Sequence, residues 1–400
     1  MNNFIAERMG LISTSPTLVV SSKTKKMKSE GFDVADLSVG EPDFKTPIHI
    51  NKSAIEAIEQ NKGKYTAVDG MIELKKVIID KFKRDNNLSY EIDEIMVSAG
   101  AKQIIFNAMM ATINPGDEVI IPTPAWVSYI DIVQFFGGKA VCIETKIEDD
   151  FKMNASQLDG KINNKTKWII LNSPNNPTGS VYNLEELREI AEKIKNYNNV
   201  NVMSDDIYEY LIYNNDQKFH NILNADNSLK QRVLTINGVS KSYAMTGWRI
   251  GYCGGNRELI SAMKTIQSQS TTNACTISQI ASISALSGDN SFLDNVRKNL
   301  LERSQMFINF FDKHSIKYCK PEGAFYIFFD ISKFFGKKIN NLIISNSENF
   351  VNIALEKYLV SMVHGSAFGC EGFARISFAT DLETIEKSIS RIEKMIQNLT

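Results

Sequence analysis

Short apolar runs alternate with amphipathic segments from about Asp93 to Gly255, and this alternation restricts the possible fold most strongly. Runs such as EIMVSAG, DEVIIPTP and KWIILNSP are almost continuously apolar, whereas KQIIFNAMMATI and LEELREIAEKIKNY have a helical period. Strands that are buried on both faces and separated by helices are typical of a mostly parallel sheet covered by helices. This part of the chain predicts an α/β domain.

The pattern changes after about residue 290. A long charged helical stretch, NSFLDNVRKNLLERSQMFINFFDKH, is followed by the separated strands AFYIFFD and ARISFAT and by the amphipathic segment LETIEKSISRIEKMIQ. This texture predicts a smaller α+β lobe, on which the irregular first 45 or so residues pack. We therefore expect a large domain over 46–290 and a small domain formed by 1–45 together with 291–400.

Charge and cysteine content narrow the function classes. Lys plus Arg number 45 and Asp plus Glu 46, in dispersed positions, which disfavours a nucleic-acid binder. The five cysteines are widely spaced without a C-x-x-C pair, and the four histidines are scattered, so we expect neither a disulfide framework nor a metal site. No apolar stretch is long enough to cross a membrane, and no leader peptide is evident. We expect a soluble, cytoplasmic protein that binds no membrane.

The most informative segment is NGVSKSYAMTGWRIGYCGG, at 237–255. It contains neither G-x-G-x-x-G nor the P-loop motif, so its glycines do not indicate a nucleotide-binding loop. Lys241 follows the strand VLTIN, at the carboxyl edge of the predicted sheet, where open α/β folds bind ligands. A lone lysine is usually a solvated surface charge, so the neighbouring segments decide its interpretation.

The segment SKSYAMTGWRIGY resembles the cofactor-lysine segment of the class I/II aminotransferases, the fold-type I enzymes that use pyridoxal 5'-phosphate (PLP). Six further segments are similar to this family in the same order: SVGEPDF (38–44), KYTAVDG (64–70), SAGAKQ (98–103), NSPNNPTG (172–179), SDDIYE (204–209) and ARISFA (374–379). The early segment SPTLVVSSKTKKMKSEGFDV is similar to the bacterial aspartate aminotransferases of type Ib. The resemblance implies the fold-type I architecture, with a large α/β domain and a smaller α+β domain.

Three residues are expected to carry the chemistry. The resemblance makes Lys241 the Schiff-base lysine and general acid/base, roles that suit an amine whose pKa is depressed by burial and nearby cations. Asp205 follows the strand NVNVMS and is the implied partner of the pyridine nitrogen. Its neighbour Asp206 faces the opposite way along a strand, so only one of the two acids can reach the ring. Tyr208 is the third, with its phenol close to the cofactor's 3'-oxygen.

The remaining cofactor contacts are also implied by the resemblance. Asn176 donates to the same 3'-oxygen, and the Asn176–Pro177 bond is expected to be cis. Small residues at a helix N-terminus suit a phosphate, as does a guanidinium. Trp126 would stack on the ring, and a neighbouring subunit would supply Tyr65, so a homodimer with shared active sites is expected. The predicted phosphate site consists of Gly100, Ala101, Lys102, Arg249 and Tyr65. Many relatives have a phosphate-binding serine where this chain has Gly238, so Ser240 or a main-chain amide must substitute.

Arg375 is the residue implied to bind the α-carboxylate of an amino acid, because a guanidinium grips a carboxylate through two hydrogen bonds. Gly40, Trp126 and Asn176 are expected to line the same end. The predicted activity is a ping-pong transfer of an amino group between an L-amino acid and a 2-oxo acid. Aspartate and 2-oxoglutarate are the default pair by resemblance.

Side-chain specificity stays open at this point. The segment expected to face the substrate side chain, residues 12–15, contains no cation, and Met110 is apolar. An aromatic, apolar or specialised amino acid is therefore an alternative to a dicarboxylate. A β-lyase, cyclase or oxidase of the same fold is an alternative reaction. A PLP-sensing regulator is a more distant alternative, since it would need an additional DNA-binding module.

Overall fold

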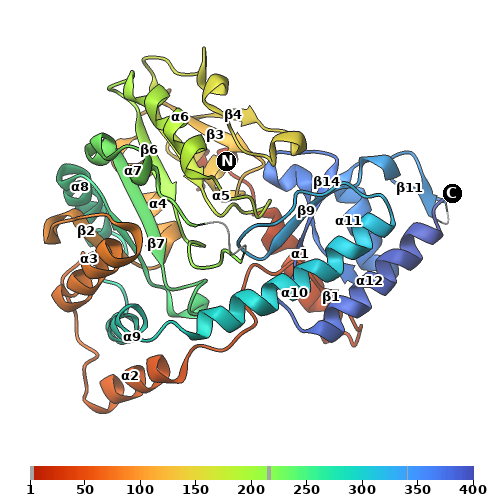
Figure 1. The fold of residues 1–400 in the computed structure, drawn as a ribbon, viewed down its shortest axis with the longest axis horizontal. Coiled ribbons are helices and arrows are strands. Elements are labelled where there is room, and N and C mark those ends of the chain that lie inside the picture. The colour runs from red at the N-terminus through yellow and green to blue at the C-terminus, as the bar shows by residue number, and fades with distance from the viewer. Residues whose placement is uncertain (1–3, 214–217, 340) are drawn as a thin grey trace.

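The computed structural model describes residues 4–213, 218–339 and 341–400, so residues 1–3 of the expected N-terminal arm lie outside the described residues. A seven-stranded sheet forms the centre of the larger lobe (Figure 1). Its strands, in spatial order, are β2 (Ile95–Ser98), β8 (Gly251–Gly254), β7 (Val233–Gly238), β6 (Asn201–Asp205), β5 (Thr166–Asn172), β3 (Glu118–Thr123) and β4 (Lys139–Glu144). The pairs from β7 to β4 are parallel and β8 is antiparallel to both its neighbours, so the prediction of a mostly parallel sheet is confirmed.

Helices cover both faces of this sheet, as the apolar strands require. Every residue of β2 and β7 is buried. One face packs against the first group of helices, α2 (Ile48–Glu59), α3 (Ile72–Asn86), α6 (Leu184–Lys195), α7 (Ile222–Ala225) and α9 (Thr276–Ser287). The opposite face packs against α4 (Ala101–Thr112), α5 (Ser128–Phe135) and α8 (Arg257–Ser268).

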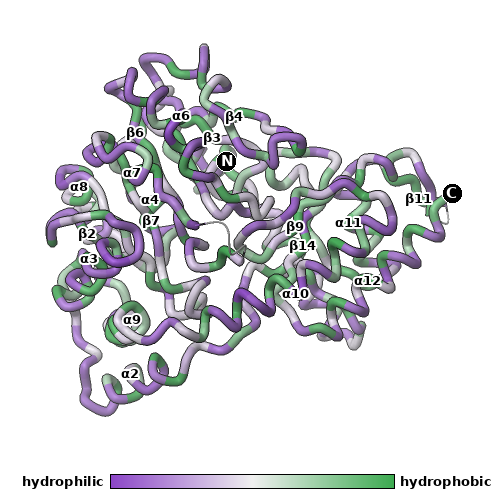
Figure 2. The backbone as a smooth tube through the Cα atoms, in the orientation of Figure 1, coloured by the Kyte–Doolittle hydropathy of each residue, from purple (hydrophilic) through white to green (hydrophobic). Residues whose placement is uncertain are grey.

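The smaller lobe contains an antiparallel sheet in the order β13 (Val363–His364), β14 (Phe373–Ser377) and β9 (Tyr326–Asp330). Its apolar core lies against α10 (Phe292–Lys313), α11 (Ser347–Tyr358) and α12 (Leu382–Gln397). In Figure 2 purple and green alternate along α10 and α12, as expected for helices with one buried side. A short hairpin, β10 (Lys338–Ile339) and β11 (Leu342–Ile343), lies near the C-terminus.

The helix α1 (Pro16–Ser29) and the strand β1 (Ala35–Asp36) of the N-terminal segment contact this smaller lobe, whereas residues 7–11 contact α5 of the larger lobe. The strand β1 pairs in parallel with β12 (Val360–Ser361). The helix α1 is attached there through a hydrogen bond of 2.7 Å from Thr24 Oγ1 to Ser361 Oγ. Eight 3-10 helices connect the described elements: η1 (Glu7–Leu11), η2 (Ile92–Glu94), η3 (Ile147–Asp149), η4 (Ala155–Leu158), η5 (Asn227–Arg232), η6 (Thr246–Trp248), η7 (Ser332–Phe334) and η8 (Gly365–Phe368).

The register of the parallel strands brings three chain segments to one sheet edge. Asn172 at the end of β5 lies opposite Asp205 at the end of β6, and Asp205 lies opposite Ile236 of β7. The strand β7 ends two residues further on, at Gly238, and the loop after it contains Lys241. Residues far apart in the sequence therefore meet at the carboxyl edge. Of the helices within the described ranges, none combines the length and the apolar character that a membrane crossing requires.

Candidate active site

A cavity of about 530 Å3 lies at this carboxyl edge, where the loop after β7 meets α1 and the smaller lobe. Ten residues that the sequence singles out line it: Gly40, Ala101, Lys102, Trp126, Asn176, Asp205, Tyr208, Lys241, Arg249 and Arg375. Ser240 lines it as well, whereas Gly100, Gly238 and Tyr65 do not. The fold thus collects at one place groups that span more than 300 positions of the chain.

Lys241 presents an amine that is largely removed from water. Its Nζ donates a hydrogen bond of 2.6 Å to the main-chain oxygen of Gly40. Burial lowers the pKa of Lys241 to about 8, and the positive charges of Arg249 and Arg375 contribute, while Glu41 and Asp205 act in the opposite direction. About a tenth of the amine is therefore neutral at pH 7, far more than for a lysine with its ordinary pKa, and a nucleophile or proton acceptor must be neutral.

Asp205 is a buried carboxyl group with one oxygen held and one oxygen free. The Tyr129 hydroxyl donates a hydrogen bond of 2.6 Å to its Oδ2, and Asn172 Nδ2 donates to its main-chain oxygen at 2.8 Å. Its Oδ1 is buried without a hydrogen-bond partner among the described residues. Burial raises the pKa of Asp205 to about 6, although the Tyr129 hydroxyl and the Lys241 charge lower it. The free oxygen is suited to a cationic N–H donor.

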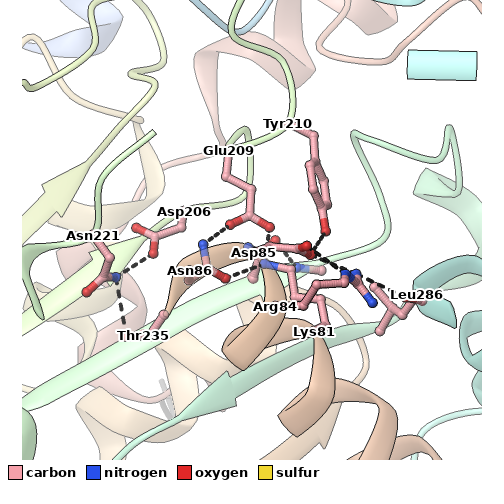
Figure 3. Close-up of polar contacts among 12 residues, drawn as sticks. Lys81, Arg84, Asp85, Asn86, Asp206, Glu209, Tyr210, Asn221, Thr235 and Leu286 are labelled. Carbon is pink, nitrogen blue, oxygen red and sulfur yellow. Dashed lines mark hydrogen bonds and ion pairs between the residues drawn. The ribbon is translucent and has the colours of Figure 1, made fainter. Parts of the chain in front are cut away.

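The neighbouring acids point away from the cavity into a buried polar cluster, which we define as Lys81, Asn86, Asp206, Glu209 and Asn221 (Figure 3). Asp206 accepts hydrogen bonds from Ser204 Oγ at 2.7 Å and from Asn221 Nδ2 at 2.6 Å. Glu209 forms an ion pair with Lys81 and accepts a hydrogen bond of 2.7 Å from Asn86 Nδ2. Of the two acids, Asp205 lines the cavity and Asp206 does not.

Arg375 forms the other charged end of the cavity. The residue is 2% exposed. Its Nη1 donates to Asn176 Oδ1 at 3.0 Å and its Nη2 to the main-chain oxygen of Ser38 at 2.8 Å. Its Nε is buried with no partner among the described residues. The Tyr326 ring lies 4.4 Å from its Cζ, and the Tyr326 hydroxyl is 3.0 Å from that of Tyr208. A buried guanidinium without a carboxylate partner is a suitable receptor for one.

The expected phosphate site lies around the N-terminus of α4. Gly100 precedes this helix with φ +90°, and a Cβ there would collide with the Arg249 guanidinium. Arg249 Nη1 is held at 2.6 Å by the main-chain oxygen of Thr246. At Gly238 a Cβ would lie only 2.9 Å from the main-chain oxygen of Ile250. This crowding explains the glycine, and it leaves Ser240, which lines the cavity, as the nearby hydroxyl.

Trp126 and Lys102 lie together on one wall. The Lys102 Nζ is 4.7 Å from the Trp126 ring centroid, a cation–π distance. Burial lowers the pKa of Lys102, and the charge of Arg249 lowers it further. Tyr65 differs from all the other predicted residues, since it is 89% exposed and outside the cavity.

Three sequence-based expectations are wrong. Residues 12–15 do not line the cavity; Thr17, Leu18, Ser21 and Lys25, which recur about once a turn along one side of α1, line it instead. Met110 does not line the cavity, because it lies about 12 Å further along α4 than Lys102. The Asn176–Pro177 bond is not cis; the cis bonds of the described residues precede Pro124 and Pro174.

Sequence reasoning also missed three supporting residues, Tyr129, Asn172 and Tyr326. Asn172 was in a recognised motif, NSPNNPTG, and Tyr129 lies three residues after Trp126, but nothing in either pattern shows which side chain it reaches. Tyr326 is in the strand AFYIFFD, where alternation alone predicts a core residue. Within the described ranges no group of three or more His, Cys, Asp or Glu side chains is placed to hold a metal ion.

Comparisons with known proteins define the class. A model of the family Aminotransferase class I and II matches residues 33–392. The chain is 49% identical to the probable aspartate/prephenate aminotransferase of Rickettsia conorii, over 98% of both chains. It is 46% identical to the aspartate/prephenate aminotransferase of Nitrosomonas europaea, over 98% of this chain and 99% of that protein.

Solved structures agree with these sequence matches. The aspartate aminotransferase of Rhizobium meliloti superposes with a TM-score of 0.95, at 43% identity and 99% coverage of both chains. That of Thermus thermophilus, solved with maleate, superposes with a TM-score of 0.92 at 35% identity, over 98% of this chain and 99% of that one. The chain therefore belongs to the class I and II aminotransferases and has the fold of their fold-type I aspartate aminotransferases. It is an aminotransferase, and the comparisons lend no support to the alternative reactions.

Proposed function

We propose that this aminotransferase uses PLP to transfer the amino group of aspartate to a 2-oxo acid. One observation carries the proposal: a partly neutral amine at Lys241, a buried carboxyl at Asp205 and the guanidinium of Arg375, whose Nε has no partner among the described residues, face a single cavity. In this arrangement the amine can bond an aldehyde, the carboxyl group can pair with a cationic ring, and the guanidinium can bind a carboxylate.

The residues fit the cofactor. Asp205 Oδ1 is an orphaned buried acceptor, which a protonated ring nitrogen would satisfy. Gly100 lets the Arg249 guanidinium lie directly against the main chain at the start of α4, because a Cβ there would collide with it. Lys241 would bond the aldehyde, and Trp126 would cover the ring. The 3'-oxygen would be held by Tyr208 and Asn176, and the phosphate by Gly100, Ala101, Lys102, Arg249, Ser240 and the Tyr65 of a second copy.

PLP, when bound, supplies an aldehyde that takes up the amino group and a ring that accepts electrons. The protein's own residues supply the rest. Arg375 and Asn176 would fix the substrate carboxylate, which orients the Cα–H bond. Lys241 Nζ would take the proton from the substrate's α-carbon and deliver it to the cofactor's C4' carbon, a role that its lowered pKa favours. Asp205 keeps its charge opposite the ring nitrogen throughout.

A dicarboxylic substrate is favoured by Lys25 of α1, a cation that lines the cavity and is not among the residues assigned to the phosphate or to the first carboxylate. The Thermus relative was solved with maleate, itself a dicarboxylate, and several relatives are named for aspartate and prephenate. Prephenate carries two carboxylates and a 2-oxo group. We therefore infer that 2-oxoglutarate is the first candidate for the amino-group acceptor and that prephenate is the second.

A homodimer is part of the proposal. Tyr65 is too exposed to act within its own subunit, and α2 presents apolar side chains to solvent, with Ile48 67% exposed and Ile58 62% exposed. Exposed apolar groups of this kind are typical of an interface. We propose that a second copy covers this region and brings its Tyr65 to the cavity.

We also propose that the large domain comprises residues 46–290 and that the small domain comprises residues 1–45 together with 291–400. The proposed location of the enzyme is the cytoplasm.

Steady-state assays with purified holoenzyme test the function. Aspartate with 2-oxoglutarate or with prephenate should give oxaloacetate and the matching amino acid, with the parallel-line kinetics of a ping-pong mechanism. Leucine and phenylalanine should be poor donors. Release of ammonia, or turnover that is faster with leucine than with aspartate, would contradict the proposal.

A further inference from the structure

The Tyr129 side chain is buried, and the proposed function assigns it no role. It lies on the first turn of α5, three residues after Trp126, and is 2% exposed. Its hydroxyl donates a hydrogen bond of 2.6 Å to Asp205 Oδ2. Its ring also contacts that of Trp126 edge to face, with centroids 5.2 Å apart and an interplanar angle of 85°. It thus touches both the residue expected to pair with the cofactor's ring nitrogen and the residue expected to stack on the ring.

The two oxygens of Asp205 have different surroundings. Within the described ranges, Tyr129 is the only side chain that hydrogen-bonds the carboxyl group through Oδ2, and Oδ1 has no partner. A main-chain N–H at Ile207 and the charge of Lys241 also favour the ionised form. The other ionisable groups that interact electrostatically with Asp205 are Asp206 and Tyr208, and neither supplies a positive charge. The hydroxyl of Tyr129 is therefore the main side-chain support of the carboxylate.

Space filling alone does not account for this arrangement. A phenylalanine would fill nearly the same volume and would pack against Trp126 in the same way. It would also avoid burying a second polar group, the hydroxyl, beside the carboxyl group of Asp205. A hydroxyl that donates to a buried carboxylate both fixes its orientation and favours its charge. A fixed orientation and a retained negative charge are both useful if Asp205 Oδ1, the free oxygen, has to pair with a cation.

We propose that Tyr129 is a positioning residue for Asp205, which holds Oδ2 so that Oδ1 is turned to the ring nitrogen of the bound cofactor. This inference rests on the proposed PLP function. Tyr129 touches no reacting atom; it acts through Asp205 and, by its ring contact, steadies Trp126.

The test compares holoenzymes of the wild type, Tyr129→Phe, Asp205→Asn and the double variant, with Tyr90→Phe as control. Tyr90 is also buried and its hydroxyl donates to Thr235 Oγ1 at 3.0 Å, outside the cavity. The measured quantities are the PLP dissociation constant and the pH midpoint of the cofactor's visible absorbance. A hydrogen bond to a charged group predicts a roughly tenfold weaker binding of PLP by Tyr129→Phe.

The absorbance midpoint should rise in the same variant. A ring nitrogen that loses its proton no longer destabilises a positive charge on the Lys241 nitrogen nearby. Asp205→Asn should show a larger rise, to which Tyr129→Phe adds nothing, and Tyr90→Phe should leave both quantities unchanged. Tyr129→His, which keeps a ring donor, should lie between wild type and Tyr129→Phe.

A wild-type midpoint and dissociation constant in Tyr129→Phe would overturn the inference, as would shifts that add fully to those of Asp205→Asn. If Tyr129→Phe does not fold, the same comparison is made with Tyr129→His and has the same two contradicting outcomes. The proposed function fails separately, if wild-type protein shows no PLP absorbance at all.

Discussion

Replacing Asp205 with asparagine is expected to abolish transamination. The same change should remove a pH-dependent loss in the unfolding free energy of the cofactor-free protein. Burial raises the pKa of Asp205 from 3.8 to about 6. The folded protein therefore binds a proton that the unfolded chain has already lost, and its stability falls as pH rises between these two values. The full difference is about 2 pKa units, or about 3 kcal/mol, and it is complete above pH 6.

Chemical unfolding of cofactor-free wild type and Asp205→Asn at several pH values measures this effect. The difference in unfolding free energy should shift in favour of the variant by about 1.5 kcal/mol between about pH 5 and about pH 7.5, roughly half of the whole effect. Asparagine leaves its side-chain amide nitrogen without a partner, which lowers the stability of the variant by the same amount at every pH. This loss therefore does not affect how the difference in unfolding free energy changes with pH. Parallel stability curves, with no change of the difference with pH, would refute a raised pKa at Asp205 and with it the poised, unsatisfied carboxylate.

Three further outcomes are expected. Covalent loading of PLP should accelerate as pH rises through about 8, the pKa of Lys241, since only a neutral amine attacks an aldehyde; a rate independent of pH, followed by absorbance, would contradict this. Gly238→Ser should lower the melting temperature and weaken PLP binding, because its Cβ would lie 2.9 Å from a main-chain oxygen of Ile250; unchanged melting and binding would argue against this crowding. Lys81→Met should destabilise the protein by about 3–5 kcal/mol in denaturant titration, because it leaves the buried carboxyl group of Glu209 without its ion-pair partner. The double variant Lys81→Met/Glu209→Gln should regain part of that loss, and an equal loss in both would show that the ion pair is not the cause.

Much of the fold could be predicted from the sequence because its strands are buried on both faces. Runs such as KWIILNSP and VLTINGVS have few polar residues, and they correspond to β5 and β7. The charged stretch after residue 290 corresponds to α10, whose one apolar side fixes its orientation on the smaller lobe. Periodicity does not reveal spatial order, so the position of β8 as an antiparallel strand between β2 and β7 could not be predicted.

The site could be predicted in part. Motifs identify residues that lie at chain turns, and the cavity brings these together, as with Lys241 and Asp205. The sequence does not reveal which side chains from other elements support them. Tyr129 reaches Asp205 across 76 positions of the chain, and α1 supplies Thr17 and Lys25 to the cavity because of how the first helix packs. Such contacts depend on tertiary packing, for which a single sequence has no local signal.

The most direct measurement is borohydride reduction of the holoenzyme, followed by mass spectrometry of its peptides. A single pyridoxyl-phosphate adduct on Lys241, absent after exposure of the enzyme to excess aspartate without an oxo acid, is the predicted result. An adduct spread over surface lysines, or one on another residue while Lys241 stays unmodified, would contradict the account.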